Sequence, residues 1–226
     1  MELLVVTLAH ISPGKDAEGL ARVRLIADTI RNAPGLMNGR FYRSREKDAY
    51  YFLLTTWENE EFWQKAQARY SPRNLLQGSD KTLLIAPPEQ WLMRYLWGYS
   101  RPSAQPNIAA AHVAAIRSDQ ADRIERGWVE SLRRQAMEPT LAFAFLARGD
   151  SEDALSAYAS PKTNTLISGR NGNNDSPSSL QTTFLNILSW PTETHRYDFY
   201  ADQNYKAINT VLSSMGTVRI LALDPL

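Results

Sequence analysis

The chain has 226 residues and contains no cysteine and only three histidines. The missing cysteine excludes disulfides, thiolate catalysis, thiolate-ligated haem, iron–sulfur clusters and cysteine zinc sites. Any chemistry must therefore come from histidine, tryptophan, tyrosine, arginine and the carboxylates.

An excess of either charge is also missing. Lysine and arginine number 25 against 24 aspartates and glutamates, a formal charge of +1, so nothing favours binding to nucleic acid or an anionic membrane. The longest apolar stretches have the length of strands and the chain opens with Met1-Glu2, so neither a membrane span nor a signal peptide is evident. We expect a soluble, cytoplasmic protein with neither nucleic acid nor a membrane as partner.

Several catalytic motifs are absent as well. No glycine-rich phosphate loop leads from a strand into a helix, and Gly-x-Ser-x-Gly and His-Glu-x-x-His do not occur. Nicotinamide binding, nucleotide hydrolysis and zinc peptidase activity therefore have no support.

The 43% apolar content of 226 residues suffices for one large core or two small ones, and two domains are favoured. Apolar periodicity and turn residues predict a β-α-β-β-α-β order in the first half. The predicted strands cover 3–11, 38–45, 49–57 and 90–100, and the helices 16–32 and 58–70. The segment 71–89 contains three prolines and is predicted to lie loosely over the surface.

The same order returns after the Pro-containing linker 101–106. Its predicted strands cover 107–117, 140–148, 182–190 and 216–223, and its helices 119–136 and 198–212. Two local matches, Trp57 with Trp190 and Arg94 with Arg219, support the repeat. We therefore predict a tandem duplication with units at 1–103 and 107–226. The second unit has diverged and carries a long loop at about 160–181, which is either a lid or a passive excursion.

Three short segments carry a resemblance to a known family: Ser12-Pro13-Gly14-Lys15, Pro34-Gly35-Leu36 and the run from Thr55 to Phe62. Together with the element order they resemble the antibiotic biosynthesis monooxygenases (ABM) of the dimeric α+β barrel superfamily. The resemblance implies an α+β fold in which two tandem ferredoxin-like units form an intramolecular dimeric α+β barrel, a pseudo-dimer within one chain. Further self-association is left open.

A four-stranded sheet covered on one face by helices needs a partner for its other face, and the repeated sheet supplies one. Strict alternation over 90–100 puts one aromatic stripe on a single face. The stripe contains Trp91, Met93, Tyr95, Trp97 and Tyr99. It either packs sheet against sheet or lines a pocket; the matching strand 216–223 has no aromatic residue.

His10 and His112 each lie on the first strand of their half, and alignment of the strand ends predicts that both face the same side. Each is either a hydrogen-bonded core residue or a general base, since imidazole transfers protons near neutral pH. Trp57 and Trp190 are expected to pack at strand–helix junctions. An arginine on an apolar strand, as at Arg94 and Arg219, needs a carboxylate, the surface or a substrate anion.

The ABM resemblance implies a monooxygenase, or a related oxidative tailoring or cyclising enzyme, that acts on an aromatic small molecule, phenolic or polyketide-like. It implies molecular oxygen as the oxidant, with no flavin, metal or other cofactor. The expected site has His10 or His112 as general base, Arg94 as anchor for a substrate oxyanion, and a stacking wall of Trp63, Tyr95 and Trp97.

The alternative is a noncatalytic protein that binds an apolar ligand or haem. Haem-degrading relatives are implied to have an asparagine on the first strand and a haem-ligating histidine late in the second helix. Thr7 lies near the first position, and Leu75 and Ile208 near the second. The sequence therefore departs from the haem pattern.

Overall fold

The structure is a computed structural model that describes residues 2–46, 49–78, 80, 82–150 and 181–226. The predicted loop at 160–181 lies outside the described residues, except for Gln181. No helix in the described ranges is long and apolar enough to span a membrane.

The first half follows the predicted order with one additional helix. It contains β1 (Leu3–His10), α1 (Asp16–Ile30), β2 (Leu36–Ser44), β3 (Tyr50–Trp57), α2 (Glu60–Tyr70), α3 (Pro72–Gln77) and β4 (Glu89–Ser100). Gly14, with φ 81°, makes the turn before α1, a backbone conformation that favours glycine. Asn59 caps α2 by accepting a hydrogen bond from the Phe62 N–H.

The second half repeats the order. It contains β5 (Ile108–Arg117), η1 (Ser118–Gln120), α4 (Ala121–Met137), β6 (Phe143–Asp150), β7 (Gln181–Trp190), α6 (Glu193–Ala201), α7 (Gln203–Met215) and β8 (Gly216–Pro225). The buried residues Ile124, Trp128 and Leu132 lie on one face of α4, as their spacing predicted. Residues 101–107, between β4 and β5, form no helix or strand.

Two predictions of local structure are wrong. The segment 71–89 does not lie loosely throughout, because Ser71 caps α3, Pro72 occupies the first turn of that helix and Leu76 is buried. Proline is compatible with a first helical turn because no N–H is needed there. The helix predicted at 198–212 is two helices, since Asp202 has extended backbone and its side chain caps α7 through the Tyr205 N–H.

The eight strands form one closed barrel in the order β1-β3-β2-β8-β5-β7-β6-β4. Each half contributes four neighbouring strands, and the halves are hydrogen-bonded to each other at both edges. β2 pairs with β8 from Tyr42–Pro225 to Ser44–Leu223, and β4 pairs with β6 from Arg94–Arg148 to Ser100–Phe143. This architecture confirms the predicted α+β fold of two ferredoxin-like units in one intramolecular barrel.

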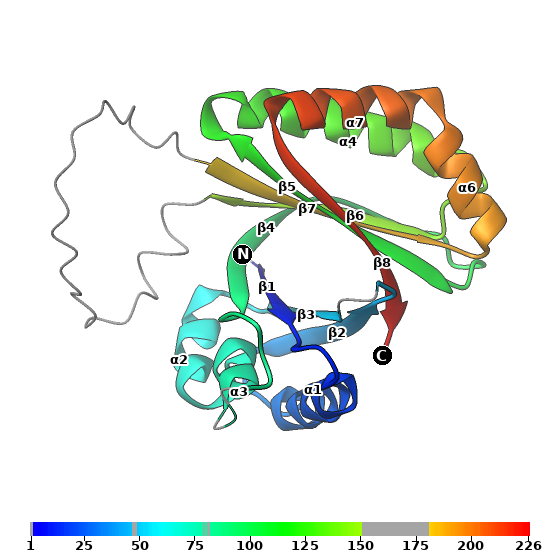
Figure 1. The fold of residues 1–226 in the computed structure, drawn as a ribbon. Coiled ribbons are helices and arrows are strands. Elements are labelled where there is room, and N and C mark those ends of the chain that lie inside the picture. Colours follow the sequence, from blue (N-terminus) through cyan, green and yellow to red (C-terminus); the bar gives the residue numbers. More distant parts are fainter. Residues whose placement is uncertain (1, 47–48, 79, 81, 151–180) are drawn as a thin grey trace, which may run out of the picture.

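Helices cover the outside of the barrel on two opposite sides (Figure 1). α1, α2 and α3 lie against the first sheet, and α4, α6 and α7 against the second. Strand alternation separates the inner and outer cores: on β1, Leu4, Val6 and Leu8 face the barrel interior, whereas Val5 and Ala9 pack toward the helices. The interior is therefore a space formed jointly by both halves.

A β-bulge breaks the alternation of β4. Tyr95 is paired with Ala147 and Trp97 with its neighbour Leu146, so one residue of β4 has no separate partner. Tyr95 therefore faces the interior, while Trp97 and Tyr99 pack into the outer core under the second-half helices. The prediction of one continuous aromatic face is wrong beyond Tyr95.

Ion pairs also join the two halves, both beside the β4–β6 junction and between β8 and β4. Arg94 on β4 and Arg148 on β6 both donate to Glu125 on α4, at 3.0 and 2.9 Å. Arg219 on β8 pairs with Glu89 on β4 at 3.1 Å. Both strand arginines that the sequence singled out, Arg94 and Arg219, thus have a carboxylate partner from the other half.

The hydrogen-bond registers of the strands define how the two halves correspond. Leu3 is paired with Trp57, and Ile108 is paired with Trp190. The match of Trp57 with Trp190 therefore holds, and both indoles pack against helical aromatic side chains. The match of Arg94 with Arg219 does not hold, because Arg94 points toward the helices while Arg219 has the parity of the interior residues Leu221 and Leu223.

The two histidines lie on opposite sides of the barrel wall, contrary to the prediction. His10 has the parity of the interior residues of β1 and stacks on Tyr50, with ring centroids 4.1 Å apart. His112 corresponds instead to Thr7 and is buried beneath the helices, where its Nε2 lies 3.1 Å from the Tyr200 hydroxyl. Burial lowers the pKa of His112 to about 4.

The low pKa of His112 leads us to expect that acid destabilises the fold. The unfolded chain binds a proton at this position below a pKa of about 6.5, whereas the folded chain does so only near pH 4. The free energy of unfolding should therefore fall by up to about 3 kcal/mol as the pH drops from 7 to 4. Urea unfolding across this range, with His112→Gln as the comparison, measures the term. Equal pH dependence in both proteins would contradict it.

Gly98 on β4 and Gly149 on β6, near the junction of these two strands, give a matched pair of stability predictions. A Cβ on Gly149 would lie 2.9 Å from the Leu92 carbonyl oxygen, whereas one on Gly98 would lie 3.8 Å from the nearest atom. We expect Gly149→Ala to cost about 1–3 kcal/mol, because backbone must shift. Gly98→Ala should be neutral or slightly stabilising, by less than about 1 kcal/mol. Thermal unfolding of both variants is the measurement, and equal midpoints would contradict the expectation.

Candidate functional site

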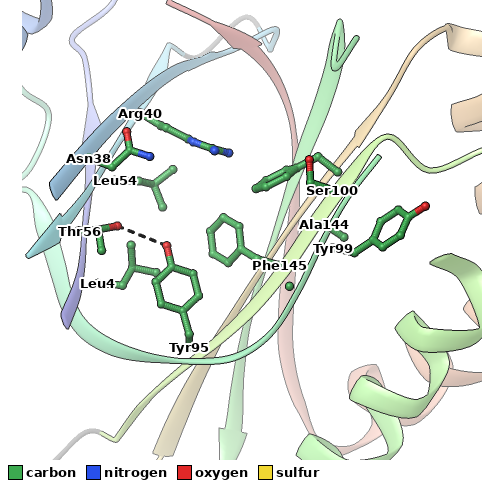
Figure 2. A pocket seen from close by; sticks show the side chains of 12 residues that line it. Leu4, Asn38, Arg40, Leu54, Thr56, Tyr95, Tyr99, Ser100, Ala144 and Phe145 are labelled. Carbon is green, nitrogen blue, oxygen red and sulfur yellow. Dashed lines mark hydrogen bonds between the residues drawn. The ribbon is translucent and has the colours of Figure 1, made fainter. Parts of the chain in front are cut away.

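A cavity of about 370 Å³ opens at the end of the barrel where β1 begins. We call it the first cavity. Five strands line it, four from the first half and β6 from the second (Figure 2). The lining consists of Leu4, Asn38, Arg40, Leu54, Thr56, Tyr95, Gly98, Tyr99, Ser100, Phe143, Ala144 and Phe145. A volume of this size suits a small organic ligand.

The walls of the first cavity are mainly apolar and aromatic. Leu4 and Leu54 come from the first sheet, and Phe143 and Phe145 come from the facing strand β6. The Tyr95 and Phe145 rings lie 5.5 Å apart at 59°. Figure 2 shows the Tyr99 ring pointing away from this space, as the bulge requires. The walls can therefore contact the faces and edges of a flat ring system.

Arg40 provides the positive charge of the first cavity. It extends from β2 into the space between the two sheets (Figure 2), and its guanidinium carbon lies 4.5 Å from the centroid of the Phe143 ring. Among the described residues no carboxylate forms an ion pair with Arg40. A guanidinium over an aromatic face, without a carboxylate, can receive an anionic ligand group.

Two phenols accompany Arg40. The Tyr95 hydroxyl lies 3.3 Å from the Thr56 hydroxyl, across the strand that carries Leu4. Tyr42 is 7% exposed and shares the inward face of β2 with Arg40. Burial raises the pKa of Tyr42, and the neighbouring Arg40 guanidinium opposes that rise. The first cavity thus combines the Arg40 cation with the hydroxyl groups of Tyr95 and Thr56, and Tyr42 lies beside it.

Of the six predicted site residues, only Tyr95 lines the first cavity. His10 faces the interior but lies at the other end of β1. The six residue steps from Leu4 to His10 span about 20 Å at about 3.3 Å per residue. A small ligand next to Leu4 therefore does not reach His10. The His10 Nε2 is buried without a hydrogen-bond partner among the described residues.

The other four predicted residues lie on the helix side of the sheets. Trp63 is fully buried and packs against Trp57, with ring centroids 5.2 Å apart. Arg94 pairs with Glu125, Trp97 stacks beside Tyr99 with centroids 6.3 Å apart, and His112 contacts Tyr200. The structure therefore does not bring the predicted base, anchor and stacking wall together.

The polar residues of β2 were missed. Asn38, Arg40, Tyr42 and Ser44 alternate along one face of β2, and this period of two was the available signal. Asn38 and Arg40 are exposed, which on sequence alone is typical of a solvated strand face. Phe143 and Phe145 were missed because the site was predicted within the first half, whereas both residues lie on β6 of the second half.

Metal and haem ligands are not gathered here. Among the described residues no group of three or more histidines, aspartates and glutamates could hold a metal ion. The lining of the first cavity contains no histidine that could ligate haem. Thr7 is fully buried on the helix side and accepts a hydrogen bond from Gln90 Nε2 at 3.0 Å. The residues present therefore do not fit haem.

Comparison with known proteins finds a family likeness in the first half. The family model of the antibiotic biosynthesis monooxygenases matches residues 3–69, which contain β1 to β3, α1 and nearly all of α2. No curated protein matches the chain in sequence. The matched residues include Asn38, Arg40, Leu54 and Thr56 of the first cavity.

Solved structures share the fold over the whole chain. A candidate monooxygenase from Fusobacterium nucleatum has a TM-score of 0.67 at 8% identity, covering 100% of this chain and 92% of that chain. An anthrone oxidase-like protein has a TM-score of 0.70 at 11% identity, with 100% and 91% covered. A candidate chlorite dismutase has a TM-score of 0.57 at 13% identity, with 100% and 96% covered. The likeness to the antibiotic biosynthesis monooxygenase family model therefore lies in residues 3–69, and the solved structures share the α+β barrel fold over the whole chain.

Proposed function

We propose that this protein is a cofactor-independent monooxygenase that oxidises a phenolic, anthrone-like aromatic molecule in the first cavity. The observation that carries the proposal is Arg40, a cation without a carboxylate partner among the described residues, placed inside apolar and aromatic walls. The family match over residues 3–69 supports the reaction class. The neighbour described as anthrone oxidase-like supports the choice of an anthrone as test substrate.

In the proposed reaction the substrate itself supplies the electrons. The phenolic substrate loses a proton to water at the open mouth, and Arg40 stabilises the oxyanion that remains. The electron-rich anion then reduces oxygen. A methylene carbon becomes a carbonyl: its two hydrogens leave with one oxygen atom as water, and the other oxygen atom stays on carbon. Carbon loses four electrons and the oxygen molecule gains four, so no further reductant is needed.

The remaining lining residues would position the ring. Phe143 and Phe145 offer aromatic faces, and Leu54 offers an apolar surface on the opposite sheet. The paired hydroxyls of Thr56 and Tyr95 can hydrogen-bond a second substrate oxygen. This arrangement would hold the reacting carbon at a fixed distance from Arg40, so that positioning and charge stabilisation act together.

A noncatalytic ligand-binding role is the second candidate. The described lining of the first cavity has neither imidazole nor carboxylate to act as a base, and the candidate chlorite dismutase neighbour fits a binding role as well as an oxidative one. A visible absorption band in the purified protein would indicate a bound pigment or haem. A colourless protein that consumes oxygen with a hydroxylated anthrone supports the enzyme.

Arg40→Gln should lower kcat/KM for a hydroxylated anthrone by about 100-fold, the usual cost of removing a group that stabilises developing charge. It should also raise the pH at which kcat/KM reaches half its maximum, because the bound phenol then loses its proton less readily. Oxygen uptake, corrected for oxidation without enzyme, measures both effects.

Arg40→Lys restores the charge and should recover part of the lost rate, which a purely structural role would not predict. Arg94→Gln provides the direct comparison between the two arginines. If both variants are folded and Arg94→Gln lowers kcat/KM more than Arg40→Gln does, the anchor of the substrate oxyanion is Arg94, as the sequence predicted.

The histidine assignment is tested by His10→Ala combined with His112→Gln. We expect kcat to change by less than about tenfold, because the first cavity contacts neither side chain. Circular dichroism checks that the double variant is folded. A loss of about 100-fold or more in folded protein would make an imidazole the base and would require a ligand that extends toward His10.

A further inference from the structure

A second cavity, of about 340 Å³, lies beside the first at the same end of the barrel. Its walls come mainly from the second half and from the linker between the halves. The lining consists of Gly39, Arg40, Phe41, Tyr42, Ser100, Ala104, Pro106, Ala109, Ala142, Phe143, Ser189, Pro225 and Leu226. No role assigned above uses this space.

The second cavity is the repeat of the first. Because Leu3 and Ile108 occupy equivalent positions opposite Trp57 and Trp190, Leu4 is equivalent to Ala109. The same register makes Thr56 equivalent to Ser189. One member of each pair lines the first cavity and the other lines the second. Each half therefore contributes one cavity to the shared barrel mouth.

The two cavities have a common wall. Arg40, Ser100 and Phe143 line both of them. Arg40 is exposed and reaches over Phe143 with its guanidinium carbon 4.5 Å from the ring centroid. The flexible Arg40 side chain is thus one of the three residues at this boundary. The same cation is available to a ligand from either side.

Ser189 contributes a buried hydroxyl group to the wall of the second cavity. The residue is 3% exposed, and its hydroxyl oxygen is buried without a hydrogen-bond partner among the described residues. Buried hydroxyls are nearly always hydrogen-bonded. Because Ser189 also lines the second cavity, a ligand oxygen is the candidate partner for this hydroxyl.

We propose that the two cavities form one site that binds a single elongated aromatic anion, with one ring system in each cavity and its negative charge on Arg40. This inference deepens the proposed function and rests on it for the reaction, because it gives the size and charge of the substrate. One cation serves both cavities, so one monoanionic ligand satisfies the site. Two separate ring anions would place like charges on the same guanidinium, which is unfavourable.

Binding of two matched fluorescent probes to the full chain tests the inference without turnover. Anilinonaphthalene sulfonate has two ring systems and one anionic group, and N-phenylnaphthylamine has the same rings without the charge. We expect the sulfonate to bind with a stoichiometry of one per chain in calorimetry. The neutral probe should bind at least about tenfold more weakly, and Arg40→Gln should remove most of that difference.

Ser189→Leu and Thr56→Leu fill the two cavities at repeat-equivalent positions. Each should weaken binding of the sulfonate by about tenfold or more, because each removes the space for one ring system. Benzoate, a single-ring anion, should lose affinity in only one of the two variants. Ala104→Trp, on the linker, blocks the second cavity without altering a strand. It replaces Ser189→Leu if that variant unfolds at a lower urea concentration than the parent.

A stoichiometry of two, an unchanged affinity in both Ser189→Leu and Ala104→Trp, or no binding of the sulfonate would overturn the inference. These outcomes are distinct from failure of the proposed reaction. A protein that binds the sulfonate across both cavities but consumes no oxygen would keep the two-cavity site and lose only the oxidation. A protein that oxidises the anthrone but is insensitive to the Ser189 and Ala104 changes would keep only the oxidation.

Discussion

Closure of the barrel is the constraint on which the rest of the structure depends. Each half alone would leave two edge strands with unpaired backbone groups, and exposed edges of this kind invite unwanted pairing. Here β2 meets β8 and β4 meets β6, so all eight strands are paired on both sides. An eight-stranded barrel is just wide enough to be filled by side chains or to hold one small ligand. Closure therefore creates the interior, and the size of the lining side chains decides where it stays open.

The sequence was sufficient for the order of elements, because helices and strands with one buried face have periodic apolar residues. It was sufficient for the pairing of two sheets, since a sheet covered on one side needs a partner. It could not predict the bulge in β4, where an extra residue between Tyr95 and Trp97 exchanges the two faces. A pattern with a period of two contains no mark of such an insertion, so Trp97 was assigned to the wrong side.

The same reasoning explains most of the misplaced site residues. His10 and His112 were aligned by the ends of their strands, but hydrogen-bond register makes His112 equivalent to Thr7. Register depends on partners far away in the sequence, and a shift of one residue moves a side chain to the opposite face. Arg40 was missed for a different reason. Its side chain is exposed, and only closure of the two halves encloses it between aromatic walls.

Fusion of the two halves also changes what a single arginine can do. Arg40 is paired with Leu54, and Phe145 is paired with Ile187. Because Trp57 and Trp190 are equivalent, Leu54 and Ile187 are equivalent too. The second half therefore has the phenyl ring of Phe145 where the first half has the Arg40 cation. Two identical subunits would have to carry the arginine twice, and the two guanidiniums would confront each other across one narrow opening. In a single chain the equivalent position of the second half can carry a different residue. The tandem arrangement therefore allows a positive charge at only one of two equivalent positions in the barrel. Two identical subunits could not produce this asymmetry.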